Sequence, residues 1–142
     1  MIFPFEKNVT QEEETRTLAK LFANEINPGK IIVINGELGA GKTFFVKNAV
    51  SAWGVSNASS PSFAIVNIYY GEIKVYHFDF YRLKNKEELF DIGFNDYISD
   101  PDAVTFIEWG NLIPDVLPRS RVEINIEMQE NSVRNFRFDN YD

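Results

Sequence analysis

One segment determines the architecture expected for this chain: Ile31-Ile32-Val33-Ile34-Asn35-Gly36-Glu37-Leu38-Gly39-Ala40-Gly41-Lys42-Thr43. Its first four residues form a continuous apolar run, which is typical of a short strand buried on both faces. Residues 36–43 then match the pattern G-x-x-x-x-G-K-T of a phosphate-binding loop. We expect a helix to follow this loop as far as Trp53, with Gly54 as its end signal. Strand, loop and helix thus occur in the order that phosphate binding requires.

The loop sequence indicates what its side chains and backbone do. Glycines allow the chain to turn tightly around phosphates, so that backbone N–H groups and the start of the helix face the anion. Lys42 adds a positive charge for the β- and γ-phosphates, and the hydroxyl of Thr43 is suited to ligate Mg²⁺. The nucleotide-binding residues expected from the loop are Gly36, Glu37, Leu38, Gly39, Ala40, Gly41, Lys42 and Thr43.

Two acidic residues are candidates for the second metal ligand that such a loop needs. Asp79 follows the run Val75-Tyr76-His77-Phe78, and Glu108 follows the apolar run 103–107. A metal-binding acid at the end of a neighbouring strand has this form. His77 alternates with Asp79, so both side chains should project from one face of the sheet. The pattern leaves open whether His77 is a structural imidazole or a base, and which acid contacts Mg²⁺ directly.

The rest of the chain predicts a mixed sheet flanked by helices. Thr10 and Glu13 have the spacing of a capping box at the start of a helix that Pro28-Gly29 ends. The other expected elements are strands at 65–70 and 73–80 joined at Gly71-Glu72, a helix at 86–90, a buried strand at 103–107, and a hairpin of 122–128 and 134–138 turning at Asn131-Ser132. This pattern indicates the α/β class, with a P-loop NTPase-like mixed β-sheet in one compact domain spanning residues 1–142.

Composition and charge exclude several classes of protein. The 142 residues include 14 Lys+Arg and 21 Asp+Glu, giving a net charge of −7. This charge disfavours tight direct binding of nucleic acid, whose affinity comes mainly from cations that neutralise phosphates. No cysteine and a single histidine exclude disulfides, thiolate metal sites and multi-histidine metal centres. Residues 1–8 lack the features of a signal peptide, and no apolar run approaches a membrane span, so we expect a cytoplasmic protein with no membrane contact.

The 13 Phe, 2 Trp and 6 Tyr residues exceed what one small core obviously needs, which fits a partner surface, although a core rich in phenylalanine is the alternative.

The sequence also bears on the choice of base. Guanine-binding P-loop proteins carry an Asn-Lys-x-Asp element, whereas this chain has Asn85-Lys86-Glu87-Glu88. Asn85 as a helix cap with Glu88 three residues later explains that segment better, so ATP is favoured over GTP.

Four blocks in order give the chain a specific resemblance. They are Gly36–Thr43, Ser60-Pro61-Ser62-Phe63, His77-Phe78-Asp79-Phe80-Tyr81-Arg82, and Glu108-Trp109. Together they resemble the TsaE (YjeE) family of small P-loop ATPases in bacterial tRNA threonylcarbamoyladenosine biosynthesis, over essentially the whole chain. Two positions depart from the family pattern, because Phe44 and Ser62 stand where Thr is usual. At Phe44 the backbone N–H remains available to the nucleotide.

The resemblance implies an ATPase that uses ATP with Mg²⁺, releases ADP, and joins a complex with the TsaB and TsaD proteins. That complex modifies adenosine 37 of tRNA, so tRNA is reached only indirectly. The resemblance also implies that Glu108 lies nearest the metal, that Asp79 orients water, and that Glu12 or a neighbour lies near the nucleotide. The remaining residues of the motif blocks, expected in a switch or at the site, are Ser60, Ser62, His77, Tyr81, Arg82 and Trp109.

Two other functions are compatible with a phosphate-binding loop. A small-molecule kinase also uses such a loop with Mg²⁺, but it normally adds a substrate-binding domain and an arginine-bearing lid, for which few residues remain. A nucleotide-gated binding switch with negligible hydrolysis would need no further elements. Turnover measured with the partner proteins separates the switch from the ATPase.

Overall fold

A computed structural model of the chain describes residues 1–61 and 64–142. Over these residues the strands form a single seven-stranded sheet. The strands are β1 (Phe5–Val9), β2 (Ile31–Gly36), β3 (Val66–Tyr70), β4 (Lys74–Asp79), β5 (Ala103–Glu108), β6 (Arg121–Met128) and β7 (Arg134–Tyr141). The α-helices are α1 (Glu12–Glu25), α2 (Lys42–Ser51), α3 (Glu87–Asp91) and α4 (Phe94–Ile98).

The strand order is β1-β7-β6-β2-β5-β4-β3. The four inner strands β6, β2, β5 and β4 run parallel, whereas β7, β1 and β3 pair antiparallel at the two sides. Every residue of β5 and all but the last of β2 are buried, as expected of parallel strands covered on both faces. The predicted mixed α/β sheet is therefore confirmed.

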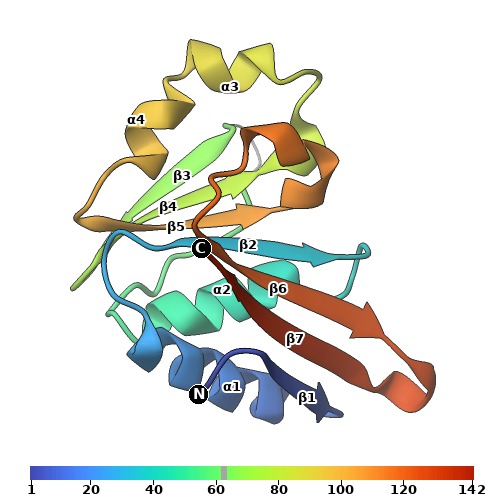
Figure 1. Cartoon of the computed structure of the whole chain (residues 1–142). Helices are drawn as coiled ribbons and strands as arrows, with labels where there is room; N and C mark the ends of the chain where they lie inside the picture. The colour runs from blue at the N-terminus through green and yellow to red at the C-terminus, as the bar shows by residue number, and fades with distance from the viewer. Residues whose placement is uncertain (62–63) are drawn as a thin grey trace.

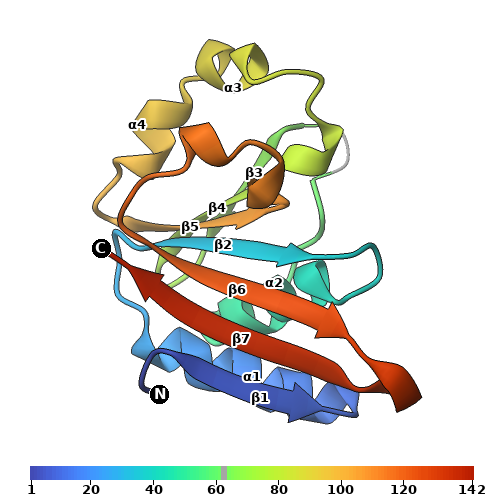
Figure 2. The same ribbon diagram turned by 45° about the vertical axis from the view of Figure 1, so that its right-hand side comes forward.

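Helices cover both faces of the sheet (Figure 1). Helices α1 and α2 lie against one face, and α3 and α4 lie beyond the other. Figure 2 shows β1 at the sheet edge beside α1, close to the N-terminus. No helix within the described residues is long and apolar enough to cross a membrane. The carboxyl ends of the parallel strands meet at one edge, where the phosphate-binding loop leaves β2.

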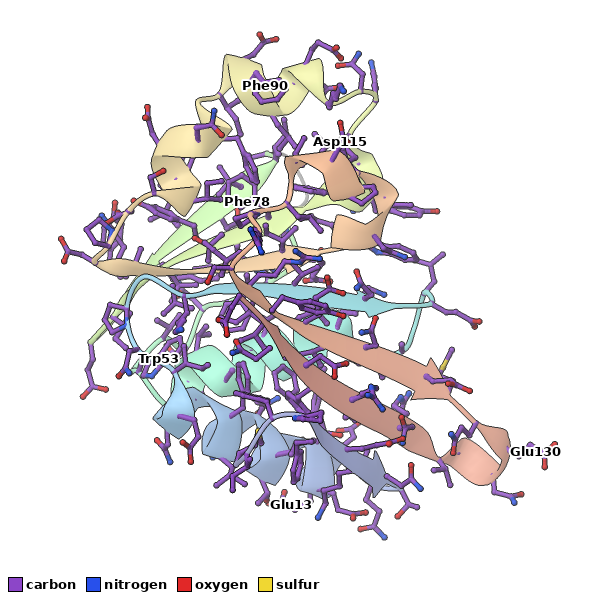
Figure 3. The ribbon with its side chains drawn as sticks, viewed as in Figure 1. Glu13, Trp53, Phe78, Phe90, Asp115 and Glu130 are labelled. Carbon is purple, nitrogen blue, oxygen red and sulfur yellow. The ribbon has the colours of Figure 1, made fainter. Side chains whose placement is uncertain are left out.

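Each face of the sheet has its own apolar core. Figure 3 shows Phe78 between the sheet and helices α3 and α4, and Trp53 on the opposite side. Eight phenylalanine side chains are fully buried: Phe22, Phe45, Phe78, Phe80, Phe94, Phe106, Phe136 and Phe138. Of the two interpretations of the aromatic residues, the phenylalanine-rich core therefore accounts for most phenylalanines, whereas Tyr70, Tyr81, Phe90 and Tyr141 remain exposed.

Several element boundaries differ from the sequence prediction. The Thr10–Glu13 capping box is wrong. Helix α1 begins one residue later than that box implies, so the carboxylate of Glu14 accepts hydrogen bonds from the N–H (3.0 Å) and hydroxyl (2.9 Å) of Thr10. Helix α2 ends at Ser51, two residues early, although Gly54 does adopt the positive φ of an end signal. Strand β1 and helix α4 were not predicted.

Candidate functional site

The loop between β2 and α2 has the backbone that its glycines predict. A Cβ at Gly36 would lie 3.0 Å from the carbonyl oxygen of Ile126 and 3.1 Å from Cβ of Ala40, so a side chain has almost no room there. Gly41 is the N-cap of α2 with φ of 105°, a left-handed conformation that favours glycine. The first turn of a helix leaves backbone N–H groups without intrahelical partners, which suits this loop to an anion.

Lys42 lies folded back along the loop. Its Nζ donates hydrogen bonds to the carbonyl oxygens of Gly36 (2.7 Å) and Glu37 (2.9 Å), and it lies 4.2 Å from the centre of the Trp109 ring. Burial lowers the pKa of Lys42, while the carboxylates of Glu108 and Asp79 act in the opposite direction. A buried ammonium ion that contacts, among the described residues, carbonyl oxygens and an aromatic ring is well placed to bind a phosphate oxygen.

The two predicted acids lie side by side at the carboxyl edge of the sheet. Asp79 ends β4 and is the register partner of Glu108 at the end of β5. Both oxygens of Glu108 lie 2.9 Å from the hydroxyl of Thr43. Asp79 accepts hydrogen bonds from the backbone N–H of Tyr81 (3.0 Å) and the hydroxyl of Ser60 (3.2 Å). The structure thus brings together Thr43, Asp79 and Glu108 from three elements.

These side chains border a cavity of about 360 Å³ at the start of α2. Tyr81, Arg82 and Trp109 also line it, and the rings of Tyr81 and Trp109 lie 5.0 Å apart. The cavity lining from the predicted set comprises Leu38, Gly39, Gly41, Lys42, Thr43, Phe44, Ser60, Asp79, Tyr81, Arg82, Glu108 and Trp109. Ser62 lies outside the described residues. Arg82 belongs to a 3₁₀ turn, Phe80–Arg82, and not to the strand expected to run past Asp79.

The oxygen donors here suit Mg²⁺. A hydroxyl and a carboxylate in contact are hard ligands, and Mg²⁺ takes its remaining ligands from water and phosphate. Within the part of the chain that the structure describes, no group of three His, Cys, Asp or Glu side chains forms a metal cage. Thr43 and Glu108, with Asp79 close by, are therefore the residues that could hold a magnesium ion bound together with a nucleotide.

His77 is fully buried and does not line the cavity. Its Nε2 lies 2.6 Å from Oε2 of Glu108, and its Nδ1 lies 2.9 Å from the hydroxyl of Tyr69. The histidine therefore contacts Glu108 on the side away from the cavity and has no direct access to a ligand there. Of the two interpretations left open by the sequence, this placement favours an imidazole that orients its neighbours.

A second hollow of about 220 Å³ adjoins the other side of the loop. Glu12 and Phe44 line it, which places the predicted Glu12 beside the phosphate-binding loop. Arg134, which the sequence analysis missed, also lines it and donates through Nη2 to the carbonyl oxygen of Gly39 (3.3 Å). Among the described residues, the buried Nε of Arg134 has no hydrogen-bond partner. An unpartnered buried donor beside a phosphate loop is a candidate ligand contact.

The segment that replaces a guanine-binding element is structural. The side-chain oxygen of Asn85 accepts a hydrogen bond from the N–H of Glu88 (3.2 Å), and Lys86 forms an ion pair with Asp115 (2.9 Å). Asn85 thus bonds the first turn of α3, although the N-cap position is Lys86, one residue later than expected. None of these residues lines either hollow.

Asp79→Asn should stabilise the protein at neutral pH. Burial raises the pKa of Asp79, as does the charge of Glu108, although the hydrogen bond from Tyr81 opposes this rise. Folding then favours the protonated carboxyl, so the carboxylate lowers stability as the pH rises from its unfolded pKa of 3.8 through the higher folded pKa. In urea unfolding we expect a higher midpoint for the variant at pH 7, with the difference shrinking toward pH 4. A difference that does not change with pH would contradict this assignment.

Comparisons with known proteins show similarity over most of the chain. The family model described as "Threonylcarbamoyl adenosine biosynthesis protein TsaE" matches residues 9–136. The chain is 37% identical to a tRNA threonylcarbamoyladenosine biosynthesis protein TsaE from Rickettsia conorii, over 89% of this chain and 73% of the relative. It is 36% identical to the TsaE of Bacillus subtilis, over 89% of this chain and 79% of the relative.

A solved structure extends this similarity to the fold. The crystal structure of Bacillus subtilis YdiB superposes with a TM-score of 0.80 at 31% identity, covering 97% of this chain and 86% of the other. The range matched by the family model, residues 9–136, spans the segments that carry the phosphate-binding loop and both acids. On this agreement of sequence and fold, the chain belongs to the TsaE family of tRNA threonylcarbamoyladenosine biosynthesis proteins.

Proposed function

We propose that this protein is a Mg²⁺-dependent ATPase that acts with TsaB and TsaD to support threonylcarbamoylation of adenosine 37 in tRNA. One observation carries the proposal. The Thr43 hydroxyl touches both oxygens of Glu108 at 2.9 Å in the cavity that also holds Lys42 and Asp79. A hydroxyl, a carboxylate and an ammonium ion beside a helix start are the groups that bind a magnesium nucleotide.

Each residue then has a distinct task. The loop N–H groups and Lys42 bind the phosphates, and Thr43 and Glu108 hold the metal through oxygen. Bound there, Mg²⁺ neutralises charge that develops on the phosphate oxygens. Asp79, beside Glu108 at the edge of the sheet, orients the attacking water. Because burial raises its pKa, this carboxylate accepts a proton from water more readily than an ordinary aspartate does. ADP and phosphate are the products.

The cavity supplies few positive charges to stabilise the phosphates during hydrolysis. Of the described residues lining the cavity, Lys42 and Arg82 are the two cations. P-loop enzymes that lack one stabilising cation hydrolyse slowly until a partner supplies it or orders the site, an effect of about 10³–10⁵ in rate. We therefore propose weak hydrolysis by the chain alone and stimulation by TsaB and TsaD. With a net charge of −7, the protein would reach tRNA through those partners.

Arg134→Ala should weaken ATP binding by about 10-fold, the effect of one lost charge-assisted hydrogen bond. The reason is that the unpartnered Nε of Arg134 lies in the hollow beside Gly41 and Phe44, next to the phosphate loop. Calorimetric titration with ATP measures the change. Arg137→Ala is the matched control, because Arg137 lies on the same strand but pairs with Glu6 and Asp139 at the surface. Equal affinities for the wild type and Arg134→Ala would remove this residue from the site.

The binding step of the proposal is tested by titrating the wild-type protein with ATP and GTP, each with Mg²⁺. We expect ATP to bind and GTP to bind more weakly, since the Asn85 segment caps a helix and contacts no described part of either hollow. Absence of ATP binding would overturn the proposed function. Equal binding of both nucleotides would overturn only the choice of base.

A further inference from the structure

Behind the cavity, a chain of buried hydrogen bonds leads from Glu108 to a loop that precedes β3. Oε2 of Glu108 contacts Nε2 of His77 at 2.6 Å, and Nδ1 of the same ring contacts the Tyr69 hydroxyl at 2.9 Å. His77 is fully buried and Tyr69 is 4% exposed. Because a carboxylate only accepts hydrogen bonds, Nε2 is the donor to Glu108. The other ring nitrogen, Nδ1, is then the atom that contacts the Tyr69 hydroxyl.

The Tyr69 hydroxyl holds the backbone of a single loop residue. It lies 2.7 Å from the carbonyl oxygen of Ser59 and accepts a hydrogen bond from the N–H of Ser59 at 3.1 Å. The amide of Asn67 also donates to the Ser59 carbonyl, at 3.2 Å. Both backbone polar groups of Ser59 are therefore fixed by side chains of β3, and the hydroxyl of Tyr69 links them to His77.

The next loop residue returns to the cavity. The hydroxyl of Ser60 donates to Oδ2 of Asp79 at 3.2 Å. The short segment Ser59-Ser60 is thus tied to both acids of the site, to Asp79 directly and to Glu108 through Tyr69 and His77. A change in the position or charge of Glu108 alters its contact with Nε2 of His77. Because Nδ1 of the same ring contacts Tyr69, a movement of the ring also affects Tyr69.

We propose that His77 and Tyr69 are positioning residues that couple the state of Glu108 at the metal site to the placement of the Ser59 backbone. This inference rests on the proposed function, because it assumes that Glu108 responds to a bound magnesium nucleotide. By linkage, the coupling is reciprocal: Mg²⁺ binding changes the protection of the Ser59 amide, and release of Ser59 weakens Mg²⁺ binding. Ser59 and Ser60 thereby respond to the metal through these hydrogen bonds.

Tyr69→Phe tests the coupling, because it removes one hydroxyl and keeps the buried ring. Tyr76→Phe is the matched control. Tyr76 is 8% exposed in the same sheet, and its hydroxyl binds Asp100 at 2.6 Å, outside the chain of contacts to Glu108. The measurements are hydrogen exchange of the Ser59 amide, with and without Mg²⁺ in the presence of ATP, and the affinity of the ATP-bound protein for Mg²⁺.

In the wild type and in Tyr76→Phe, we expect Mg²⁺ to change exchange of the Ser59 amide by about 5-fold, the size of one net hydrogen bond. In Tyr69→Phe this Mg²⁺-dependent ratio should fall to about 1, and Mg²⁺ should bind about 5-fold more weakly, while ATP affinity measured in a chelator is unchanged. A purely structural role for Tyr69 would raise exchange in all states and leave the ratio unaltered.

His77→Gln provides a second variant if Tyr69→Phe does not fold. Its amide can donate to Glu108 but cannot bridge to Tyr69 as the imidazole does, so the same loss of the ratio is expected. An unchanged ratio in the folded variant, with normal binding of ATP and Mg²⁺ by the wild type, overturns the coupling and leaves the proposed function standing. Failure of the wild type to bind ATP with Mg²⁺ overturns both.

Discussion

We expect Lys42→Ala to abolish productive binding of ATP with Mg²⁺ and to leave the fold intact. Truncating one partner of a buried charged contact costs about 2–5 kcal/mol, which corresponds to a loss of affinity of about 30-fold to more than 10³-fold. The fold survives because, among the described residues, the Nζ of Lys42 contacts two loop carbonyls and the Trp109 ring. The two carbonyl residues, Gly36 and Glu37, line a separate hollow of about 590 Å³ that water can enter. Calorimetry measures the affinity, and thermal unfolding checks the fold.

Lys47→Ala is the matched control for this variant. Lys47 lies exposed on the same helix, α2, so its substitution removes an equal charge without reaching the cavity. We expect its affinity for ATP to match that of the wild type. Wild-type affinity and turnover in Lys42→Ala would show that the phosphates lie elsewhere.

Glu108→Gln should reduce ATP turnover measured with TsaB and TsaD by about 10²-fold, because a metal held in the site lowers the barrier by several kcal/mol. Glutamine keeps the shape and an oxygen acceptor for the Thr43 hydroxyl but removes the charge that binds the cation. ATP affinity in a chelator should change little, since the loop and Lys42 remain. The Mg²⁺ concentration needed for half-maximal turnover should rise.

Glu72→Gln makes the same change of charge at an exposed turn between β3 and β4 and should leave turnover unaltered. Normal turnover of Glu108→Gln in the presence of both partners would transfer the metal-binding role to another residue. Asp79, its register partner on β4, would then be the first candidate.

The central part of the fold could be predicted because its signals are contiguous. The buried strand, the glycine loop and the start of the following helix all lie within residues 31–43, and their structure depends on neighbours in sequence. Strand β1 escaped prediction because Phe5–Val9 is an edge strand with three exposed residues in its middle, so it lacks an alternating or continuous apolar pattern. Helix α4 has only five residues, too few for a helical period to appear.

The positions of the two acids were predictable, but their contacts were not. Each acid ends a visible apolar run, which is enough to place it at the sheet edge. The contact of Glu108 with Thr43 and His77 depends in addition on the register of β4, β5 and β2. Register is set by tertiary packing and is not visible in one sequence. The register of β4 against β5 also explains why His77 contacts Glu108 without lining the cavity.

Arg134 shows where the sequence carries no local signal. It is 95 residues from Gly39, whose carbonyl it contacts, and it begins an ordinary alternating strand. It reaches the loop because β7 pairs with β6 and β6 pairs with β2. An arginine at the start of the second strand of a hairpin is most often a surface residue, so its role emerges only from the strand order.

The proposed function is tested most directly by the rate of ATP hydrolysis of this chain with Mg²⁺, alone and after addition of TsaB and TsaD. Lys42→Ala assayed with the same partners gives the background rate. The proposal predicts slow turnover by the chain alone and an increase of orders of magnitude with both partners. Such an increase is expected when a partner supplies a missing positive charge or orders the site. Nucleotide binding without such an increase would indicate a switch with negligible hydrolysis. Fast turnover by the isolated protein that TsaB and TsaD do not change would contradict the account.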